Sequence, residues 1–489
     1  MKKILIFSLA LALGFFPSCS EYLDTEPAGG RVSDEQLQEL VKENPDLVLG
    51  PMMLGATAYM HNGSNLSRTD DKGFKVWMLG LDMFQNDMVL MDLNNWFKED
   101  YVFSDIRTQT SQRAGQHWRC FYQIVYKANQ ILDLITDDAG GKALIYKAQA
   151  LTYRALGYYY LMNIYQDDYM HGGKDKAGVP LYLAVGSAQG RAPSTEVYST
   201  IIADLKTAVT LFEDAGYDPK ADATDIDQSV ANLVLARAAL SAGEYSTAAS
   251  AAAAVIAEYN LMDEATYTGG DFQDIDNPET IWGYKWVAST SLQNDSYASF
   301  MSIFATGYGG SANKSYVAID QRLFDQIEGT DYRKKNFLAD ATTIGEVTYP
   351  KYANTKFGSA DYYQDEVFMR VSEAYLLKAE AEARGGNANA AQQSLYDLVS
   401  KRDSGYSKST KTGDALLDEI FLQSRIELWG EGFEFFLNKR FNKGVNRTGS
   451  VNHAAPLTIA VGKDFTFQIP LTLELSNNPY ITEADQNPL

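Results

Sequence analysis

The chain has 489 residues and a formal net charge of −21, and 12% of its residues are aromatic, including 31 tyrosines. This length allows one large domain or two to three ordinary ones. The strong negative charge argues against nucleic acid and anionic lipid surfaces as direct partners.

The first eighteen residues have the pattern of a secretory signal. Lys2 and Lys3 precede an almost entirely apolar run over residues 4–16, and the small residue Ser18 stands directly before Cys19. The apolar run is too short for a permanent membrane-spanning helix, which needs about 20 residues. We therefore predict that residues 1–18 are a lipoprotein signal peptide that is removed from the mature protein.

Cleavage before Cys19 would leave its thiol available for a diacylglycerol and its amine available for a further acyl chain. Several acyl chains hold a protein firmly to a membrane, because each buried CH₂ contributes about 0.8 kcal/mol. The stretch resembles a bacterial lipobox with two departures, since Phe16 stands where leucine is usual and Pro17 follows it. We interpret Cys19 as the lipidation site and residues 19–30 as a lipidated tether; the alternative is ordinary secretion with an incidental cysteine.

Helical periodicity dominates the part of the chain that follows the tether. Over residues 118–135 the apolar side chains recur at three- and four-residue spacing, which predicts a helix with one buried face. Residues 142–166 continue the pattern until glycine and proline break it. Residues 197–213 predict a third helix, with Ser194 or Thr195 as its cap.

The second cysteine, Cys120, lies among apolar residues in the sequence WRCFYQIVY. With Cys19 lipidated, Cys120 has no partner for a disulfide bond. We therefore expect Cys120 to be a small buried hydrophobic residue.

Two separate segments of the chain resemble each other. One begins at Ala231 and the other at Glu373. Alanine lets two helices approach closely and glycine turns the chain between them, so the pattern predicts helical hairpins of the tetratricopeptide type. The matching pairs are Ala236/Ala379, Ala238/Ala381, Gly243/Gly386 and Ala248/Ala391.

An aromatic-rich region separates the two hairpins. Residues 261–365 are dense in Gly, Ser, Asn, Tyr, Phe and Trp, which an uninterrupted solenoid would not contain. We predict a mostly α-helical, tetratricopeptide-type scaffold that bears one large irregular insertion, where binding residues would concentrate. The predicted regions are an N-terminal helical-repeat region (31–260), an irregular ligand-binding insertion (261–365) and a C-terminal region with the last hairpin (366–489).

The chain carries no recognisable catalytic or metal-binding motif. It has no HExxH, no P-loop and no G-x-S-x-G elbow. The acidic clusters at residues 222–227 and 271–276 lack the features of an EF-hand, so we interpret them as solvated loops and predict no cofactor or metal, with a structural calcium left open. The histidines show no ligand spacing, and we expect each to be a surface or capping residue: His61, His117, His171 and His453.

The pattern of charged and apolar residues over 425–440 predicts one amphipathic helix near the C-terminus. Glu427, Glu431 and Glu434 would share one face of that helix, beside apolar leucine and phenylalanine side chains. Acidic pairs are diagnostic of a glycosidase only through their separation in space. We therefore prefer a structural role for this helix and predict no catalytic residue.

Three parts of the sequence resemble one known family. The run CSEYLDTEP from Cys19 resembles the lipidated start of SusD/RagB-family outer-membrane lipoproteins, and residues 425–432 resemble their R-x-E-L-x-x-E-G signature. The residues IP at 469–470 with Glu474, NP at 478–479 and QNP at 486–488 resemble the family's ending. Glu434 and Leu437 depart from the Arg and Asp of many members, which indicates a divergent subgroup.

The resemblance implies a SusD-like α-α superhelix and a non-enzymatic lipoprotein anchored by its lipid at the outer membrane, exposed on the cell surface. It implies a glycan ligand and, as partner, a SusC-like TonB-dependent transporter on which the protein sits as a lid. Some branches of the family capture peptides, and this remains the alternative to a glycan. A surface hydrolase is a third interpretation, which would require two facing carboxylates.

Exposed aromatic rings would form the ligand platform in this interpretation. Pyranose rings pack their C–H faces on aromatic side chains while polar side chains bond the hydroxyls. Each aromatic candidate could instead pack beneath a loop, as we expect for Trp77, Trp118 and Trp429 in the core. The predicted glycan-binding residues are Trp96 and Asn94, before the first long helix, and Trp286, Tyr297, Tyr308, Asn294 and Asp295 in the insertion.

Overall fold

The computed structural model describes residues 32–63, 68–217, 222–287, 293–310, 313–360 and 364–488. The predicted signal peptide, the lipidation site Cys19 and the tether lie outside these ranges. Within them, no helix is both long enough and apolar enough to cross a membrane.

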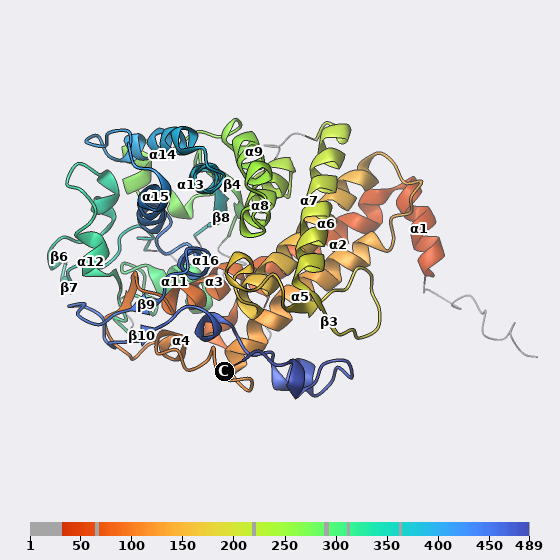
Figure 1. The fold of residues 1–489 in the computed structure, drawn as a ribbon, viewed down its shortest axis with the longest axis horizontal. Coiled ribbons are helices and arrows are strands. Elements are labelled where there is room, and N and C mark those ends of the chain that lie inside the picture. The colour runs from red at the N-terminus through yellow and green to blue at the C-terminus, as the bar shows by residue number, and fades with distance from the viewer. Residues whose placement is uncertain are drawn as a thin grey trace, which may run out of the picture.

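Two long helices form the centre of the N-terminal half (Figure 1). They are α5 (Gln112–Leu132) and α6 (Lys142–Tyr165), which confirm two of the helices predicted from periodicity. Helix α6 packs against α5 on one side and against α7 (Ser194–Ala215) on another. Its residues from Ala148 onward are all buried, because alanine, leucine and tyrosine occur on every face.

The third predicted helix is present as α7, but the prediction of its cap was wrong. Pro193 occupies the N-cap position, and no side chain caps the helix. Strand β3 (Arg191–Pro193) leads directly into the helix, and the Ser194 N–H donates to the Lys176 carbonyl at 3.0 Å. The strand connection therefore satisfies one of the N–H groups that the first turn of the helix leaves free.

Both predicted hairpins are present, and the fold brings them together. The first consists of α8 (Gln228–Ser241) and α9 (Tyr245–Ile256), and the second of α13 (Val371–Arg384) and α14 (Ala388–Arg402). Gly243 and Gly386 turn the chain with φ of 78° and 84°. Helix α13 packs directly on α9, so the repeats stack despite the long segment between them.

The strands pair in antiparallel twos rather than in one large sheet. The pairs β1·β5 and β4·β8 join parts of the chain that are far apart in sequence, and β4·β8 leads directly into helix α13. The pairs are β1 (Met88–Leu90) with β5 (Val317–Ile319), β2 (Ala177–Pro180) with β3, β4 (Thr280–Tyr284) with β8 (Glu366–Arg370), β6 (Thr342–Ile344) with β7 (Val347–Tyr349), and β9 (Val445–Asn446) with β10 (Thr458–Ile459).

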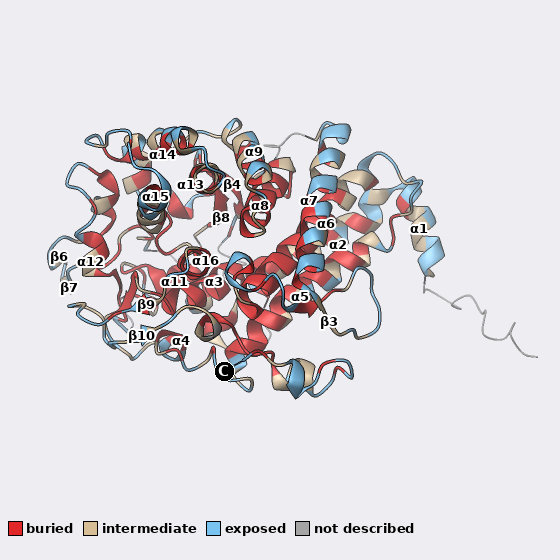
Figure 2. Cartoon of the chain, in the orientation of Figure 1, coloured by how far each residue is buried: buried red, intermediate tan, exposed pale blue. Residues whose placement is uncertain are grey.

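The remaining helices surround this frame, and buried residues fill the space between them (Figure 2). Trp77, Trp118 and Trp429 are buried as predicted, and so is Cys120. A second apolar cluster joins α3, β1, α11 and β5. The helices that surround the frame are α1 (Asp34–Glu43), α2 (Pro45–Asn62), α3 (Phe74–Met83), α4 (Lys98–Tyr101), α10 (Glu264–Thr268), α11 (Tyr297–Met301), α12 (Gln321–Phe324), α15 (Gly413–Glu427) and α16 (Glu434–Arg440).

The helix predicted over residues 425–440 is interrupted. Helix α15 ends at Glu427 and α16 begins at Glu434. Gly430 and Gly432 between them have φ of 76° and 91°, which a continuous α-helix does not allow. The prediction that three glutamates share one helical face was therefore wrong.

Candidate ligand-binding site

One exposed tryptophan stands at the end of a row of aromatic rings that reaches the core. The Trp96 side chain is 42% exposed, and its ring centroid lies 5.8 Å from that of Tyr308 in an edge-to-face arrangement. Tyr308 stacks on Phe300 at 5.4 Å, and Phe300 meets Phe97 at 5.1 Å. Because Phe97 and Phe300 are buried, the outer two rings rest on a fixed base.

Pairing of β1 with β5 explains why these rings meet. Leu90 pairs with Val317, so the loop that leaves β1 and the loop that enters β5 lie at the same end of the ladder. The Ser315 hydroxyl donates to the Asn94 carbonyl at 2.7 Å and ties the two loops together. The sequence places Trp96 in the first loop and Tyr308 ahead of the second, and the strand register makes them neighbours.

Two exposed asparagines lie near the aromatic pair in the sequence. Asn94 is exposed, while its backbone N–H donates to Asp92 Oδ1 at 2.7 Å. Asn313, two residues before Ser315, is also exposed. Amides of this kind can both donate to and accept from a hydroxyl. Sequence reasoning missed Asn313, although its position beside a glycine-rich aromatic run was a usable signal.

Trp286 and Tyr297 are buried, which corrects the expectation that they are exposed platforms. Trp286 is 6% exposed and meets Tyr284 edge to face at 4.7 Å. Tyr297 is 3% exposed, and its hydroxyl donates to the Gly430 carbonyl at 2.5 Å. The ammonium of Lys75 lies 4.7 Å from the Tyr297 ring centroid. Both rings therefore stabilise the fold rather than offer a face to a ligand.

The two polar candidates of the insertion lie at a different contact. Asn294 and Asp295 belong to a short helix, η4 (Gln293–Asp295), that packs against η1 (Thr69–Asp71). Asn294 is exposed, and Asp295 forms an ion pair with Lys72. The helix that holds them therefore contacts the segment before α3.

Two histidines are buried, contrary to the expectation that all four are surface or capping residues. Burial lowers the pKa of His61 and of His117 to about 3, so both rings are neutral at physiological pH. His117 bonds the Arg113 and Trp77 carbonyls. Within the described ranges, no group of three or more His, Cys, Asp or Glu residues is arranged to hold a metal ion.

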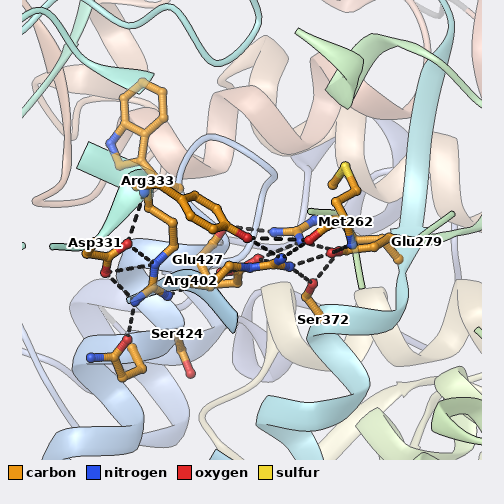
Figure 3. Close-up of polar contacts among 12 residues, drawn as sticks. Met262, Glu279, Asp331, Arg333, Ser372, Arg402, Ser424 and Glu427 are labelled. Atoms are coloured by element: carbon orange, nitrogen blue, oxygen red, sulfur yellow. Dashed lines mark hydrogen bonds and ion pairs between the residues drawn. The ribbon is translucent and has the colours of Figure 1, made fainter. Parts of the chain in front are cut away.

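Glu427 of the C-terminal signature lies in a buried network of charges (Figure 3). Its carboxylate accepts from Arg370 at 2.7 Å and from Arg402 and Arg333 at 3.2 Å each. Burial alone would raise the pKa of Glu427, but the three guanidinium groups hold it well below its ordinary value. With every lone pair directed at a cation, Glu427 is a structural anion rather than a proton donor.

The same network joins the insertion to the second hairpin. Arg402, at the end of α14, also binds Glu279, and Arg333 also binds Asp331 at 2.7 Å (Figure 3). Arg370 binds Glu431, which Lys356 also contacts at 2.6 Å. The charges balance, which buried ions require for stability. The sequence analysis identified Glu427 and Glu431 but missed their partners, although Arg370 within the apolar run VFMRV was a usable signal.

The rest of the signature supports the strand that leads to Trp96. The Arg425 guanidinium binds the Asp87 carboxylate, with one contact of 2.7 Å. The Glu434 carboxylate accepts from the backbone N–H groups of Asn86 and Asp87, at 2.9 Å each. These contacts fix the chain directly before β1. Glu434, which departs from the family pattern, therefore positions the strand that leads to the exposed tryptophan.

Comparisons with known proteins agree along most of the chain. Residues 60–257 match a family described as "Starch-binding associating with outer membrane", and residues 263–468 match the SusD family. A SusD-like protein of Formosa agariphila is 22% identical over 92% of this chain and 94% of its own.

Solved structures have the same fold. A SusD-like carbohydrate binding protein from Bacteroides vulgatus superposes with a TM-score of 0.79 at 24% identity, covering 90% of this chain and 98% of its own. A structure described as surface glycan-binding protein A from Bacteroides fluxus gives a TM-score of 0.66 at 16% identity, with coverage of 90% and 98%. These likenesses confirm the predicted mostly helical, SusD-like fold.

Proposed function

Because this chain belongs to the SusD/RagB family of non-catalytic, outer-membrane-associated glycan-binding proteins, we propose that it captures an oligo- or polysaccharide at the cell surface and delivers it to a SusC-like TonB-dependent transporter. The capture site is the Trp96–Tyr308 pair. Asn94 and Asn313 beside it bond the sugar hydroxyls.

The exposed, supported ring of Trp96 carries this proposal. A flat indole offers a pyranose ring a large contact area at a low cost in conformational entropy. Tyr308 holds the indole from its edge, and the buried Phe300 holds Tyr308 in turn. A ring fixed before binding loses little freedom when the ligand arrives, which raises affinity.

Lipidation of Cys19 keeps the binding protein at the membrane in this proposal, and residues 19–30 give it reach. The described fold begins with α1, whose capping box joins Ser33 and Gln36 close behind the tether. The helical scaffold would face the transporter and the Trp96 side would meet the ligand. Membrane attachment keeps the captured glycan near the pore, where local concentration favours transfer.

Affinity electrophoresis tests the proposal directly. The chain from Ser20 onward, which contains every described residue, is run through gels that contain amylopectin, xylan, mannan, mixed-linkage β-glucan or pectin. We expect at least one polysaccharide to retard the chain and Trp96→Ala to reduce this retardation at least about tenfold, because central aromatic residues dominate such sites. Tyr480→Ala serves as control, since Tyr480 is 63% exposed and lies away from Trp96 in the chain.

Failure of every polysaccharide in the panel would contradict the proposal. Calorimetry against mixed oligopeptides then tests peptide capture by the same architecture. A peptide ligand would require backbone groups free to bond an extended chain. If peptides bind and no glycan does, the proposed ligand is a peptide and not a carbohydrate.

A further inference from the structure

A large groove lies on the N-terminal helices of the scaffold. Its volume is about 820 Å³, within the range of small-molecule sites. Helices α2 and α6 form its walls, and the end of β4 closes it together with Tyr217, Asp222, Thr224 and Asp225. Trp96, Tyr308, Asn94 and Asn313 are not among its described lining residues. The groove is therefore separate from the capture site.

Three tyrosine rings line this groove. Tyr146 comes from α6, Tyr217 follows α7 and Tyr284 ends β4, and all three are half-buried. The Tyr217 hydroxyl donates to Asp225 at 2.6 Å, and the Tyr146 hydroxyl donates to Asp46 at 3.0 Å. Tyr284 stacks on the buried ring of His61. Hydrogen bonds and stacking thus fix rings that keep part of their surface accessible.

Gln149 provides a buried hydrogen-bond acceptor in the same groove. Its side chain is 2% exposed, and its amide nitrogen donates to Asp225 at 2.8 Å and to the Ile226 carbonyl at 3.0 Å. The donors fix the orientation of the amide. Its oxygen has no hydrogen-bond partner among the described residues. A buried acceptor without a partner favours a ligand that brings a hydroxyl or amide donor.

The charges of the groove favour a neutral ligand. Lys142 pairs with Asp46 at 2.6 Å, and Lys285 pairs with Asp276 at 2.6 Å. Both ammonium groups in the lining are therefore engaged by carboxylates. Asp222 adds a further exposed carboxylate to the lining, so an anionic ligand would be repelled.

The backbone around the groove does not favour an extended peptide. Strand β4 pairs with β8 along one edge. On the other side, the Gly283 N–H donates to the Ala223 carbonyl at 2.8 Å. Capture of a peptide by strand addition needs a free edge with unpaired groups. Tyrosine faces with a buried acceptor fit a ring-shaped, hydroxyl-rich molecule better.

We infer that this groove is a second carbohydrate-binding site, which takes a neutral saccharide on Tyr146, Tyr217 and Tyr284 with a hydroxyl donating to Gln149. The inference rests on the proposed function for the class of ligand, but on a different set of residues. Two sites on one chain can hold a polysaccharide at two points. The second contact is then intramolecular, which raises the apparent affinity for long chains above that for short ones.

The test uses variants of the chain from Ser20 onward in the polysaccharide gels. Trp96→Ala should leave residual retardation, and Trp96→Ala combined with Tyr146→Ala should remove it. Tyr146→Ala alone should weaken retardation about tenfold or more, because bivalent attachment is lost. Tyr480→Ala should change nothing. Ala58→Trp fills the groove from α2 without removing a buried side chain, so it should weaken retardation as Tyr146→Ala does. It replaces Tyr146→Ala in the test if Tyr146→Ala unfolds.

Stoichiometry gives an independent reading. Calorimetry with a short oligosaccharide of the retarding polysaccharide should give two sites per chain, one lost in Trp96→Ala and the other in Tyr146→Ala. One site per chain, lost in Trp96→Ala and unchanged in Tyr146→Ala and Ala58→Trp, would overturn the second site and leave the proposed function standing. No binding to any polysaccharide would overturn both.

Discussion

The indole of Trp96 meets the ring of Tyr308 edge to face, with 5.8 Å between their centroids. One residue follows β1 and the other precedes β5, so the contact exists only because these two short strands pair. The exposed ring is therefore positioned by the tertiary structure of the insertion. Changes at Tyr308 should reach the ligand through Trp96.

Tyr308→Ala should weaken glycan binding without removing the indole itself. Loss of an aromatic pair contact costs about 0.5–1.5 kcal/mol, which corresponds to a loss of affinity of up to about tenfold. Tyr308→Phe keeps the ring on Phe300 and should bind much more tightly than Tyr308→Ala. Calorimetry with the retarding glycan measures both. Equal affinities for Tyr308→Ala and the unmodified chain would show that the supporting ring does not matter.

Sequence periodicity was enough to predict the helical frame. The helices α5 and α6 and both hairpins follow from apolar spacing, alanine content and turn glycines, which act within a few residues of each other. The cap of α7 and the break after α15 escaped prediction, because a strand connection and two left-handed glycines decide them. The spacing of apolar residues within one segment does not predict where such tertiary and backbone features start or end a helix.

The candidate site could be predicted only in part. Trp96 stands in a polar loop, and its exposure agrees with that setting. Trp286 and Tyr297 were candidates of the same kind, yet they are buried, where Trp286 packs against His61 and Tyr297 against Phe357. Whether a ring is exposed depends on segments that fold over it. The exposure of each ring could therefore not be predicted from the local sequence alone.

Glu427→Gln should destabilise the fold strongly. The amide keeps the size of the side chain but removes the anion that Arg333, Arg370 and Arg402 share. Breaking a buried ion pair on one side costs about 3–5 kcal/mol. Urea unfolding measures the loss, with Glu264→Gln as the control.

The control removes a carboxylate from an exposed pair, Glu264 with Lys335. Surface pairs contribute little, so this variant should unfold close to the unmodified chain. Similar stability of Glu427→Gln and Glu264→Gln would contradict a stabilising role for the buried network.

Glu431 should make stability depend on acid pH. Burial alone would raise its pKa, but the charges of Arg370 and Lys356 lower it to about 2 from an ordinary value near 4.5. The contribution of the ionised group is therefore complete above pH of about 4.5 and is lost as the pH falls toward 2. A shift of this size corresponds to about 3 kcal/mol.

The difference in unfolding free energy between the unmodified chain and Glu431→Gln isolates this contribution. It should be largest above pH 5 and shrink as the pH approaches about 2. Glu483→Gln, at an exposed position, should follow the unmodified chain at every pH. A difference that stays constant between pH 5 and pH 2 would show that Glu431 does not titrate as its contacts require.

Cys19→Ala should release the protein from membranes. The substitution removes the thiol that would carry the proposed diacylglycerol, and without acyl chains the protein has no CH₂ groups to bury in the bilayer. Membrane fractionation combined with labelling by a tagged fatty acid measures the result. Cys120→Ala is the matched control, because Cys120 is buried in α5 and should not affect labelling. Lipid-labelled Cys19→Ala in the membrane fraction would contradict the assignment.

Gly432→Ala should disrupt the turn that joins α15 to α16. Gly432 has φ of 91°, and a Cβ atom there would lie 2.4 Å from Met78 Cβ in the buried helix α3. Gly386→Ala is the matched control, since φ is 84° and no atom lies within 4 Å of the added Cβ. Both variants share a backbone cost of about 1 kcal/mol, and overpacking adds about 1–3 kcal/mol in Gly432→Ala alone.

Thermal and urea unfolding of the two alanine variants separate these costs. Because α3 precedes β1, a displaced Met78 should also disturb the Trp96 loop, so Gly432→Ala should lose glycan affinity as well as stability, while Gly386→Ala should keep its affinity. Equal unfolding free energies for the two variants would mean that the turn accommodates the added Cβ atom without loss of stability. Gly432 would then not be needed for close packing against Met78.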